Sequence, residues 1–260
     1  MEILNDFGCV ILAAGDRKHP QDPGLGTKAK NLADFNGRPV IAWVVDKAIK
    51  AGLNPEQITL VIKPELSEHF RAAVPPVIRF AGQSQATGSV DALRAAIEQR
   101  VLPNCEHLLI LMGDQPNLNP AKLNHFMLRH RKNRKLVTIS TFYGNRNHPW
   151  FKKCGIIRRD VNGFFEAIVK SPIPAKKTQE LHAGPYCFNT KWLQLCLKQL
   201  PLKHEGEIHV YVAAEAAAHI YGAETFQIGT AEEILGIDTF DALEHLRQKT
   251  KNNLAPQNPR

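Results

Sequence analysis

The sequence predicts an α/β protein of Rossmann-like type, with a mainly parallel mixed sheet and helices on both of its faces. Short, almost continuously apolar segments alternate with longer segments of helical periodicity as far as Phe142, a pattern typical of strands that are buried on both sides. The composition, with 43% hydrophobic and 22% charged residues, is that of an ordinary globular chain. A length of 260 residues is enough for one large domain with a substantial core.

The first half of the chain contains the regular part of this pattern. Each expected strand is a short apolar run, and each expected helix carries apolar residues three and four positions apart. We expect strands over residues 9–12, 58–62, 77–80, 107–112 and 136–142. We expect helices over residues 39–51, 65–73, 89–99 and 120–131. The first of these helices ends before Gly52, a residue that favours a helix C-terminus.

The second half is less regular and predicts a small β-rich lobe. Residues 154–160 and 163–169 form an expected hairpin, because Asp160-Val161-Asn162-Gly163 contains residues typical of tight turns. Further strands are expected over residues 184–188 and 225–228, and further helices over 190–200, 210–219 and 239–249. We therefore expect a single domain over residues 1–250. Residues 251–260 are expected to form a flexible tail, since they are polar and contain two prolines.

Composition disfavours several functional classes. No apolar run approaches the roughly 20 residues that span a membrane, and residues 1–8 lack the basic start of a secretory signal, so we expect a cytoplasmic protein with no membrane partner. Five scattered cysteines argue against a disulfide framework. The net charge of +8 favours anionic partners. The densest basic stretch, residues 129–135, contains no interleaved aromatic residues, so we expect no nucleic-acid partner. The oligomeric state stays open.

Three expected strand or helix ends carry residues that can bind a ligand. Ligands of open parallel sheets bind beyond the carboxyl ends of the strands. The first strand ends in Leu12-Ala13-Ala14-Gly15, where small residues allow backbone N–H groups to approach a base or a phosphate. Asp114 follows a buried strand and can supply a carboxylate to Mg²⁺ or cap the helix that follows. Asp238 precedes the last expected helix and is equally suited to a metal or, with Thr239, to helix capping.

Taken together, these motifs resemble the opening and closing segments of the sugar nucleotidylyltransferases. The LAAG motif at residues 12–15 is followed by Lys30-Asn31-Leu32 and Asn36-Gly37-Arg38-Pro39, which are similar to the PK-x-L and G-[KR]-P segments of that family. Residues 83–92 resemble its base-reading segment. Residues 236–243 resemble its closing metal segment, in the form found in CMP-KDO synthetase.

The resemblance extends to the acceptor side. Residues 154–169 resemble the hairpin that holds the sugar, and together with the opening they are nearest to the pyrophosphorylase domain of UDP-N-acetylglucosamine pyrophosphorylase. Gly113-Asp114-Gln115-Pro116 is instead similar to a segment of molybdopterin nucleotidylyltransferases. The resemblance covers residues 8–245 and specifies the superfamily better than the substrate.

This resemblance implies a Mg²⁺-dependent transferase of nucleotide-sugar biosynthesis. A phosphate oxygen of a sugar phosphate or similar acceptor attacks the α-phosphorus of an NTP, with UTP favoured, and pyrophosphate leaves. Lys30 and Arg17 are implied to contact phosphate, and Asp114 and Asp238 to hold the metal. The implied nucleotide-binding residues are Leu12, Ala13, Ala14, Gly15, Gln83, Gln85, Thr87 and Gly88. The implied acceptor-binding residues are Gly155, His182 and Gly184.

Some of these assignments have alternatives. Gln83 and Gln85 are equally well explained as polar loop residues, and His182, which stands in the place of an asparagine, as a buried structural histidine. The loop after Gly15 is stretched over residues 16–28, so Arg17, Lys18 and Lys28 compete for the part of the loop arginine.

Lys170 stands where the family has a glutamate. The departures cluster on the sugar side and indicate a different acceptor. Two alternatives stay open: a molybdopterin or cytidylyl transferase of the same superfamily, and a nucleotide-binding regulatory module with weakened turnover.

Overall fold

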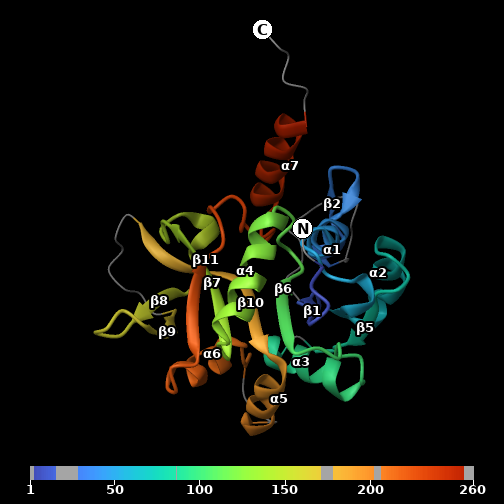
Figure 1. The fold of residues 1–260 in the computed structure, drawn as a ribbon. Helices are drawn as coiled ribbons and strands as arrows, with labels where there is room; N and C mark the ends of the chain where they lie inside the picture. Colours follow the sequence, from blue (N-terminus) through green and yellow to red (C-terminus); the bar gives the residue numbers. More distant parts are fainter. Residues whose placement is uncertain (1–2, 16–28, 86, 171–177, 202–205, 255–260) are drawn as a thin grey trace.

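A nine-stranded sheet forms the centre of the molecule (Figure 1). The computed structural model describes residues 3–15, 29–85, 87–170, 178–201 and 206–254. In spatial order, the main path of the sheet consists of β11 (Ala223–Gln227), β7 (Val137–Gly144), β10 (Gln179–Asn189), β6 (His107–Met112), β1 (Phe7–Leu12), β4 (Ile58–Ile62) and β5 (Arg79–Gly82). A hairpin of β8 (Ile156–Arg159) and β9 (Phe165–Val169) is attached through the pairing of β8 with β10.

The half of the sheet from β6 to β5 is parallel. β1 pairs in parallel with β6 on one side and with β4 on the other, and β4 pairs in parallel with β5. In the other half, β10 is antiparallel to both β6 and β7, and β11 is parallel to β7. The mainly parallel, mixed sheet predicted from the sequence is confirmed. Because the parallel strands end at the same edge, the residues that follow them come together there.

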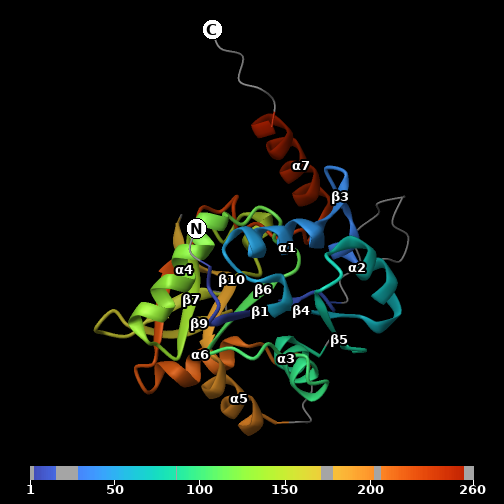
Figure 2. The same ribbon diagram turned by 45° about the vertical axis from the view of Figure 1, so that its right-hand side comes forward.

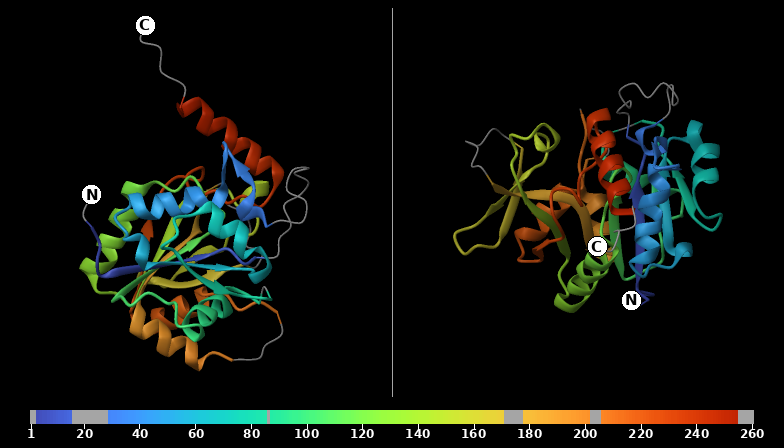
Figure 3. Two further views of the ribbon diagram at one scale, coloured as in Figure 1. Left: turned by 90° about the vertical axis from the view of Figure 1, so that its right-hand side faces the viewer. Right: turned by 90° about the horizontal axis from the view of Figure 1, so that it is seen from above.

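Helices cover both faces of the sheet, as predicted (Figures 2 and 3). One face is covered by α1 (Val40–Lys50), α2 (Ser67–Ala73), α4 (Pro120–Asn133) and α7 (Phe240–Leu254). The other is covered by α3 (Ser89–Glu98), α5 (Thr190–Gln199) and α6 (Tyr211–Ala218). Figure 3 shows these two layers with the sheet between them, and the β8–β9 hairpin standing out at one side.

The alternation of side chains along each central strand explains the two layers. In β1, Cys9 and Ile11 belong to the apolar cluster under α1 and α4, whereas Val10 belongs to the cluster under α3. β6 divides in the same way, with Leu109 on the first face and Ile110 on the second. A strand that is buried on both faces must be apolar at every position, which is the continuous pattern seen in the sequence.

Several element boundaries differ from those expected. β10 begins at Gln179 rather than at residue 184, because its polar first residues pair with the end of β7. β5 covers Arg79–Gly82 rather than residues 77–80, since the Ile78 amide donates to the Pro75 carbonyl in a turn. A two-stranded hairpin of β2 (Asp34–Phe35) and β3 (Arg38–Pro39) was not expected.

The last helix is longer than expected. α7 continues to Leu254, past residue 249 and into the segment expected to be a flexible tail. The first residue after Leu254 that cannot continue a helix is Pro256, and the Thr250 hydroxyl donates to the Leu246 carbonyl at 2.9 Å. Residues 255–260 lie outside the described residues. Within the described chain, each helix is too short or too polar to cross a lipid bilayer.

Candidate functional site

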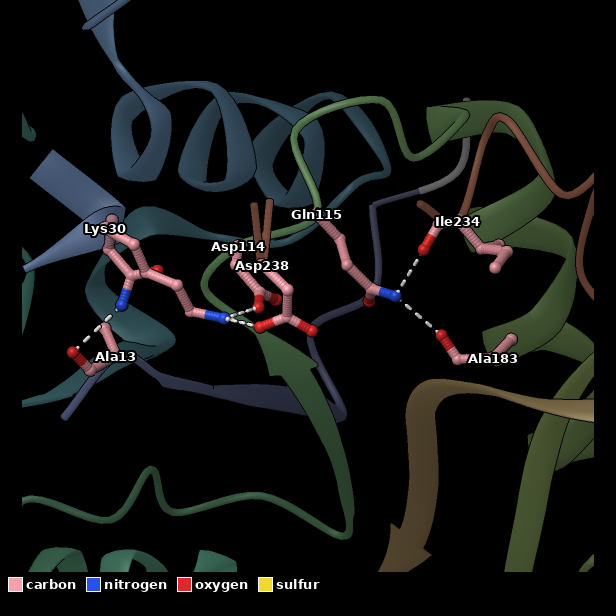
Figure 4. Close-up of polar contacts among 8 residues, drawn as sticks. Ala13, Lys30, Asp114, Gln115, Ala183, Ile234 and Asp238 are labelled. Carbon is pink, nitrogen blue, oxygen red and sulfur yellow. Dashed lines mark hydrogen bonds and ion pairs between the residues drawn. The ribbon is translucent and has the colours of Figure 1, made fainter. Parts of the chain in front are cut away.

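Three segments that are far apart in the sequence meet where β1 and β6 end (Figure 4). Lys30 begins the short helix η1 (Lys30–Leu32), Asp114 follows β6, and Asp238 precedes α7. The Lys30 ammonium donates hydrogen bonds to Oδ2 of Asp114 and, at 2.7 Å, to Oδ1 of Asp238. The Lys30 side chain is only 10% exposed, whereas that of Asp238 is 38% exposed. One cation therefore lies between two carboxylates, and the three groups together carry a formal charge of −1.

Hydrogen bonds to the backbone set the positions of these segments. Nδ2 of Asn31 donates to the Ala13 carbonyl at 3.0 Å and so ties η1 to the turn after β1. The Ile237 amide donates to the Asp114 carbonyl at 2.9 Å and ties the segment before α7 to the end of β6. The convergence of the three charged groups therefore follows from the sheet and its connections, in addition to the ion pairs themselves.

Residues near the two carboxylates in the sequence accept the capping hydrogen bonds of the adjacent helices. The N-cap of α4 is Asn119, whose side chain accepts hydrogen bonds from two amides of the first turn. At the start of α7, the Thr239 hydroxyl accepts a hydrogen bond from the Ala242 amide at 3.2 Å. The capping roles considered for Asp114 and Asp238 are thus filled by neighbouring residues, and both carboxylates face Lys30.

The electrostatic balance keeps Lys30 charged. Burial by itself would lower its pKa. The charges of Asp114 and Asp238, and the hydrogen bonds to them, outweigh burial, so the pKa of Lys30 is raised above its ordinary value. Lys30 therefore acts as a fixed positive charge and not as a proton donor at neutral pH.

A pocket of about 240 Å³ opens on one side of this cluster, and we call it the first pocket. Five residues expected to bind the nucleotide line it: Leu12, Ala14, Gly15, Gln83 and Gly88. Gln83 is buried, and its Nε2 donates to the Gly88 carbonyl at 3.3 Å. Small residues that follow β1 or precede α3, namely Ala14, Gly15 and Gly88, therefore form part of the wall of this pocket.

Other residues expected to bind nucleotide or phosphate are placed differently. Ala13 is buried behind the lining, Gln85 is exposed, and the Thr87 amide donates to the Gln85 carbonyl at 3.0 Å. These three are absent from the described lining of the first pocket. The basic loop residues considered for phosphate binding lie outside the described residues: Arg17, Lys18 and Lys28.

A second pocket of about 260 Å³ lies beside the first. It is lined by all three residues expected to bind the acceptor: Gly155, His182 and Gly184. Five described residues line both pockets: Ser89, Met112, Asp114, His209 and Asp238. The two carboxylates therefore stand where the pockets meet, so a ligand in either pocket can reach them.

Gln115 holds the wall of the second pocket together (Figure 4). It is 6% exposed, and its side-chain amide donates to the carbonyls of Ala183 and Ile234, both at 2.7 Å. Gly184 has a φ of +111°, and a Cβ added there would lie 2.9 Å from Oε1 of Gln115. This close approach explains why a glycine occupies the position.

His182 is compatible with both roles considered for it, because it is half-buried and also lines the second pocket. Burial, and then the charges of Lys170 and His209, lower its pKa to about 3. The neutral ring accepts a hydrogen bond at Nε2 from the Gly184 amide at 3.3 Å. Its proton is therefore on Nδ1, and the residue supplies a donor.

Sequence reasoning missed several residues of the site. Asn31 and Gln115 directly follow Lys30 and Asp114. Their position next to predicted site residues was the sequence signal that could have identified them. His209 lines both pockets, stacks on Tyr211 with ring centroids 5.6 Å apart and lies 3.4 Å from a Glu207 carboxylate oxygen. Nothing in the local sequence of His209 distinguishes it from an ordinary residue before a helix.

A mainly parallel sheet covered on both faces, with two pockets that meet at a carboxylate pair and a buried lysine, is an arrangement suited to a nucleotidyltransferase domain. Comparison with known families agrees. The MobA-like NTP transferase domain matches residues 9–172. The chain belongs to this family.

Curated relatives extend the likeness over most of the chain. The bifunctional protein GlmU of Geotalea uraniireducens is 25% identical over 247 residues, which are 90% of this chain and 50% of that protein. The bifunctional protein GlmU of Thermodesulfovibrio yellowstonii is 28% identical over 241 residues, which are 88% of this chain and 49% of that protein. The chain thus spans about half the length of the curated relatives it matches.

Among solved structures, a similar fold is that of CMP-2-keto-3-deoxy-manno-octonic acid synthetase in complex with CTP. The TM-score is 0.68 with 19% sequence identity, over 96% of this chain and 100% of that chain. At this identity the likeness establishes the fold, which is the α/β fold predicted from the sequence.

Proposed function

We propose that the protein is a Mg²⁺-dependent nucleotidyltransferase that joins an NTP to a sugar 1-phosphate or a similar phosphorylated acceptor and releases pyrophosphate. The observation that carries this proposal is the convergence of Lys30, Asp114 and Asp238 where the two pockets meet. Phosphoryl transfer asks little covalent chemistry of a protein and depends on positioning and charge neutralisation. A carboxylate pair and a fixed ammonium are groups of that kind.

The carboxylate pair fits a hard divalent cation. Asp114 and Asp238 approach the same ammonium, so their oxygens already surround a cation-sized position. Mg²⁺ is commonly held by one or two carboxylates together with substrate phosphates. When bound, Mg²⁺ would neutralise charge on the triphosphate and the pyrophosphate. Lys30 would then exchange part of its contact with the carboxylates for contact with phosphate.

In this proposal the NTP occupies the first pocket. The backbone at Ala14 and Gly15 would approach its phosphates or base, and Gln83 and Gly88 would contact the base and ribose. Small residues and glycine allow close approach of a flat base or a phosphate to the chain. UTP is the favoured nucleotide, a preference that rests on the resemblance of residues 83–92 to base-reading segments.

The acceptor occupies the second pocket. One of its phosphate oxygens attacks the α-phosphorus, a new P–O bond forms, and the bond from the α-phosphorus to the bridging oxygen breaks. Pyrophosphate leaves with the electron pair of that bond. Gly155, His182 and Gly184 would position the acceptor, and Gln115 would keep their wall in place.

Two other functions are distinguished by the same assay. The residues after β6, Asp114-Gln115-Pro116, favour a molybdopterin or cytidylyl transferase. The departures at Lys170 and His182 favour a nucleotide-binding module with weakened turnover. Pyrophosphate release should be measured with UTP, CTP, GTP and ATP against a panel of phosphorylated acceptors in the presence of Mg²⁺.

The test of the proposal is the Asp114→Asn variant in this assay. We expect its pyrophosphate release to fall by about a thousandfold, because a carboxylate that helps to hold the metal is lost. Asp241→Asn, which removes an exposed carboxylate three residues beyond Asp238, should retain the wild-type rate. An unchanged rate in Asp114→Asn would refute the metal role. Nucleotide binding without pyrophosphate release from any combination would favour the regulatory module.

A further inference from the structure

The second pocket differs from the first in the charge of its walls. Apart from Asp114 and Asp238 at the junction, the charged side chains that line it within the described residues are Lys153 and Lys170. The pocket also contains His182 and His209. The lining of the second pocket therefore adds cations and hydrogen-bond donors to the carboxylate pair, whereas Glu207 adds a carboxylate to the first pocket.

Lys170 is directed into this environment by its neighbours. It follows β9, and its backbone carbonyl accepts a hydrogen bond from the Arg146 guanidinium. Its ammonium lies 4.8 Å from the centre of the Tyr211 ring at the start of α6, a distance at which a cation is attracted to the face of the ring. Tyr211 itself lines the pocket. The ammonium and the ring therefore lie next to each other in the lining of the second pocket.

The two lysines and His182 give part of this wall a donor character. A lysine ammonium has three donors and no acceptor, and His182 supplies a further donor at Nδ1 because its Nε2 already accepts from the Gly184 amide. A neutral sugar hydroxyl is recognised best by a group that can accept its hydrogen. A carboxylate or phosphate, which only accepts, matches donors at every lone pair.

We propose that the acceptor is a phosphorylated compound with a second anionic group, a carboxylate or a second phosphate, at the end remote from its reacting phosphate. This inference rests on the proposed nucleotidyl transfer, with the reacting phosphate near Asp114 and Asp238. The second anionic group contacts Lys170 and Lys153. Acceptors that carry an amine at this position, such as ethanolamine phosphate, are rejected by the same charges.

The experiment measures acceptor binding without turnover. The protein is loaded with Mg²⁺ and the α,β-methylene analogue of the NTP that binds it most tightly, and acceptor affinity is measured by calorimetry. Two matched pairs are used: glucose 1-phosphate against glucuronic acid 1-phosphate, and glycerol 3-phosphate against 3-phosphoglycerate. Glucose 1,6-bisphosphate tests a second phosphate in place of the carboxylate, and ethanolamine phosphate tests a cation.

We expect the anionic member of at least one pair to bind about fivefold more tightly or better, the gain typical of one partly exposed ion pair. Lys170→Glu should abolish or invert this preference, and Lys153→Glu should reduce it. Lys152→Glu, at a neighbouring exposed lysine that lines neither pocket, should leave it unchanged. Circular dichroism verifies that the variants fold.

Two results would overturn the inference. One is a protein that binds the nucleotide analogue but prefers the anionic member in neither pair and does not bind the bisphosphate. The other is a preference that survives unchanged in Lys170→Glu. Failure of the nucleotide analogue to bind would be a different result, because it would refute the proposed function itself.

Discussion

The two pockets meet at Asp114 and Asp238 but are lined by different kinds of residue. The lining of the first includes small residues that follow β1 or precede α3, Ala14, Gly15 and Gly88, beside larger polar side chains. The lining of the second includes more aromatic side chains: Trp150, Phe151, Tyr186 and Tyr211. Where small residues expose the backbone, the wall follows the topology of the sheet. Where large side chains form the wall, substitutions can change the ligand while the sheet stays the same.

The largest effect on activity is expected at Lys30, which contacts both carboxylates where the pockets meet. Lys30→Met should lower kcat/KM by about a thousandfold, because the ammonium that faces both carboxylates would no longer be available to the transferring phosphate. It should also raise the affinity of the nucleotide-free protein for Mn²⁺, since the competing cation is gone. Steady-state kinetics and Mn²⁺ titration measure the two effects. Lys50→Met, at an exposed lysine of α1, serves as the control.

If Lys30→Met kept activity within tenfold of the wild type, the place where the two pockets meet would not be the reacting centre. An unchanged Mn²⁺ affinity would mean that Lys30 and the metal do not share the carboxylates.

Substitution of one glycine in each pocket, Gly88 in the first and Gly184 in the second, allows the two walls to be compared. Gly88 has φ +109° and ψ 175°, and a Cβ there would collide with the carbonyl oxygen of Ile208. At Gly184 a Cβ would meet the Gln115 side chain. Each Gly→Ala change should cost about 1–3 kcal/mol of stability through backbone strain, and Gly88→Ala should cost more because a backbone carbonyl cannot move aside as a side chain can.

Kinetic measurements should also distinguish the effects of the two glycine substitutions. Gly88→Ala should raise KM for the NTP, and Gly184→Ala should raise KM for the acceptor, because each changes the wall of one pocket. Thermal denaturation and two-substrate kinetics provide the measurement. If both variants changed the same KM, the assignment of one substrate to each pocket would be wrong.

A further expected effect concerns the pH dependence of stability. Burial lowers the pKa of His182 to about 3, and burial also lowers that of His130, a buried residue of α4, to about 3. The unfolded chain takes up a proton near pH 6.5 and the folded chain does not, so each histidine contributes stability above pH 6.5 that is lost as the pH falls toward 3. The loss is at most about 1.4 kcal/mol per pH unit for each residue.

His182→Gln and His130→Gln should each make the free energy of unfolding less dependent on pH below 6.5. Only His182→Gln should also change KM for the acceptor, because His130 does not line the second pocket. Denaturant unfolding at several pH values measures the first effect. A protonated His182 at pH 6, observed by NMR, would contradict its burial in neutral form.

The fold could be predicted because the parallel half obeys simple rules. β4 and β6 are almost continuously apolar, and their predicted bounds are those of the structure. The antiparallel half was harder, because the first residues of β10 are polar and are held in the sheet by β7 and β8. Such pairing depends on partners that are distant in the sequence, so a local sequence pattern does not indicate it.

The candidate site likewise contains residues whose place could be predicted from the sequence and residues whose place could not. Asp114 and Asp238 could be predicted because each charged residue follows or precedes an apolar segment at an element boundary. Their common partner, Lys30, came from resemblance to a family, since a lysine in a loop has no distinguishing local signal. Gln115 acquires its place through hydrogen bonds to Ala183 and Ile234, and His209 through its position where the two pockets meet.

The central claim is that two carboxylates from distant segments jointly hold the metal–triphosphate. It is tested most directly by measuring Mn²⁺-dependent NTP binding in Asp238→Asn against Asp241→Asn, by calorimetry with and without the metal. Our account predicts that Asp238→Asn weakens metal-dependent binding by about tenfold or more, while Asp241→Asn binds like the wild type. Equal affinities in the two variants would contradict it.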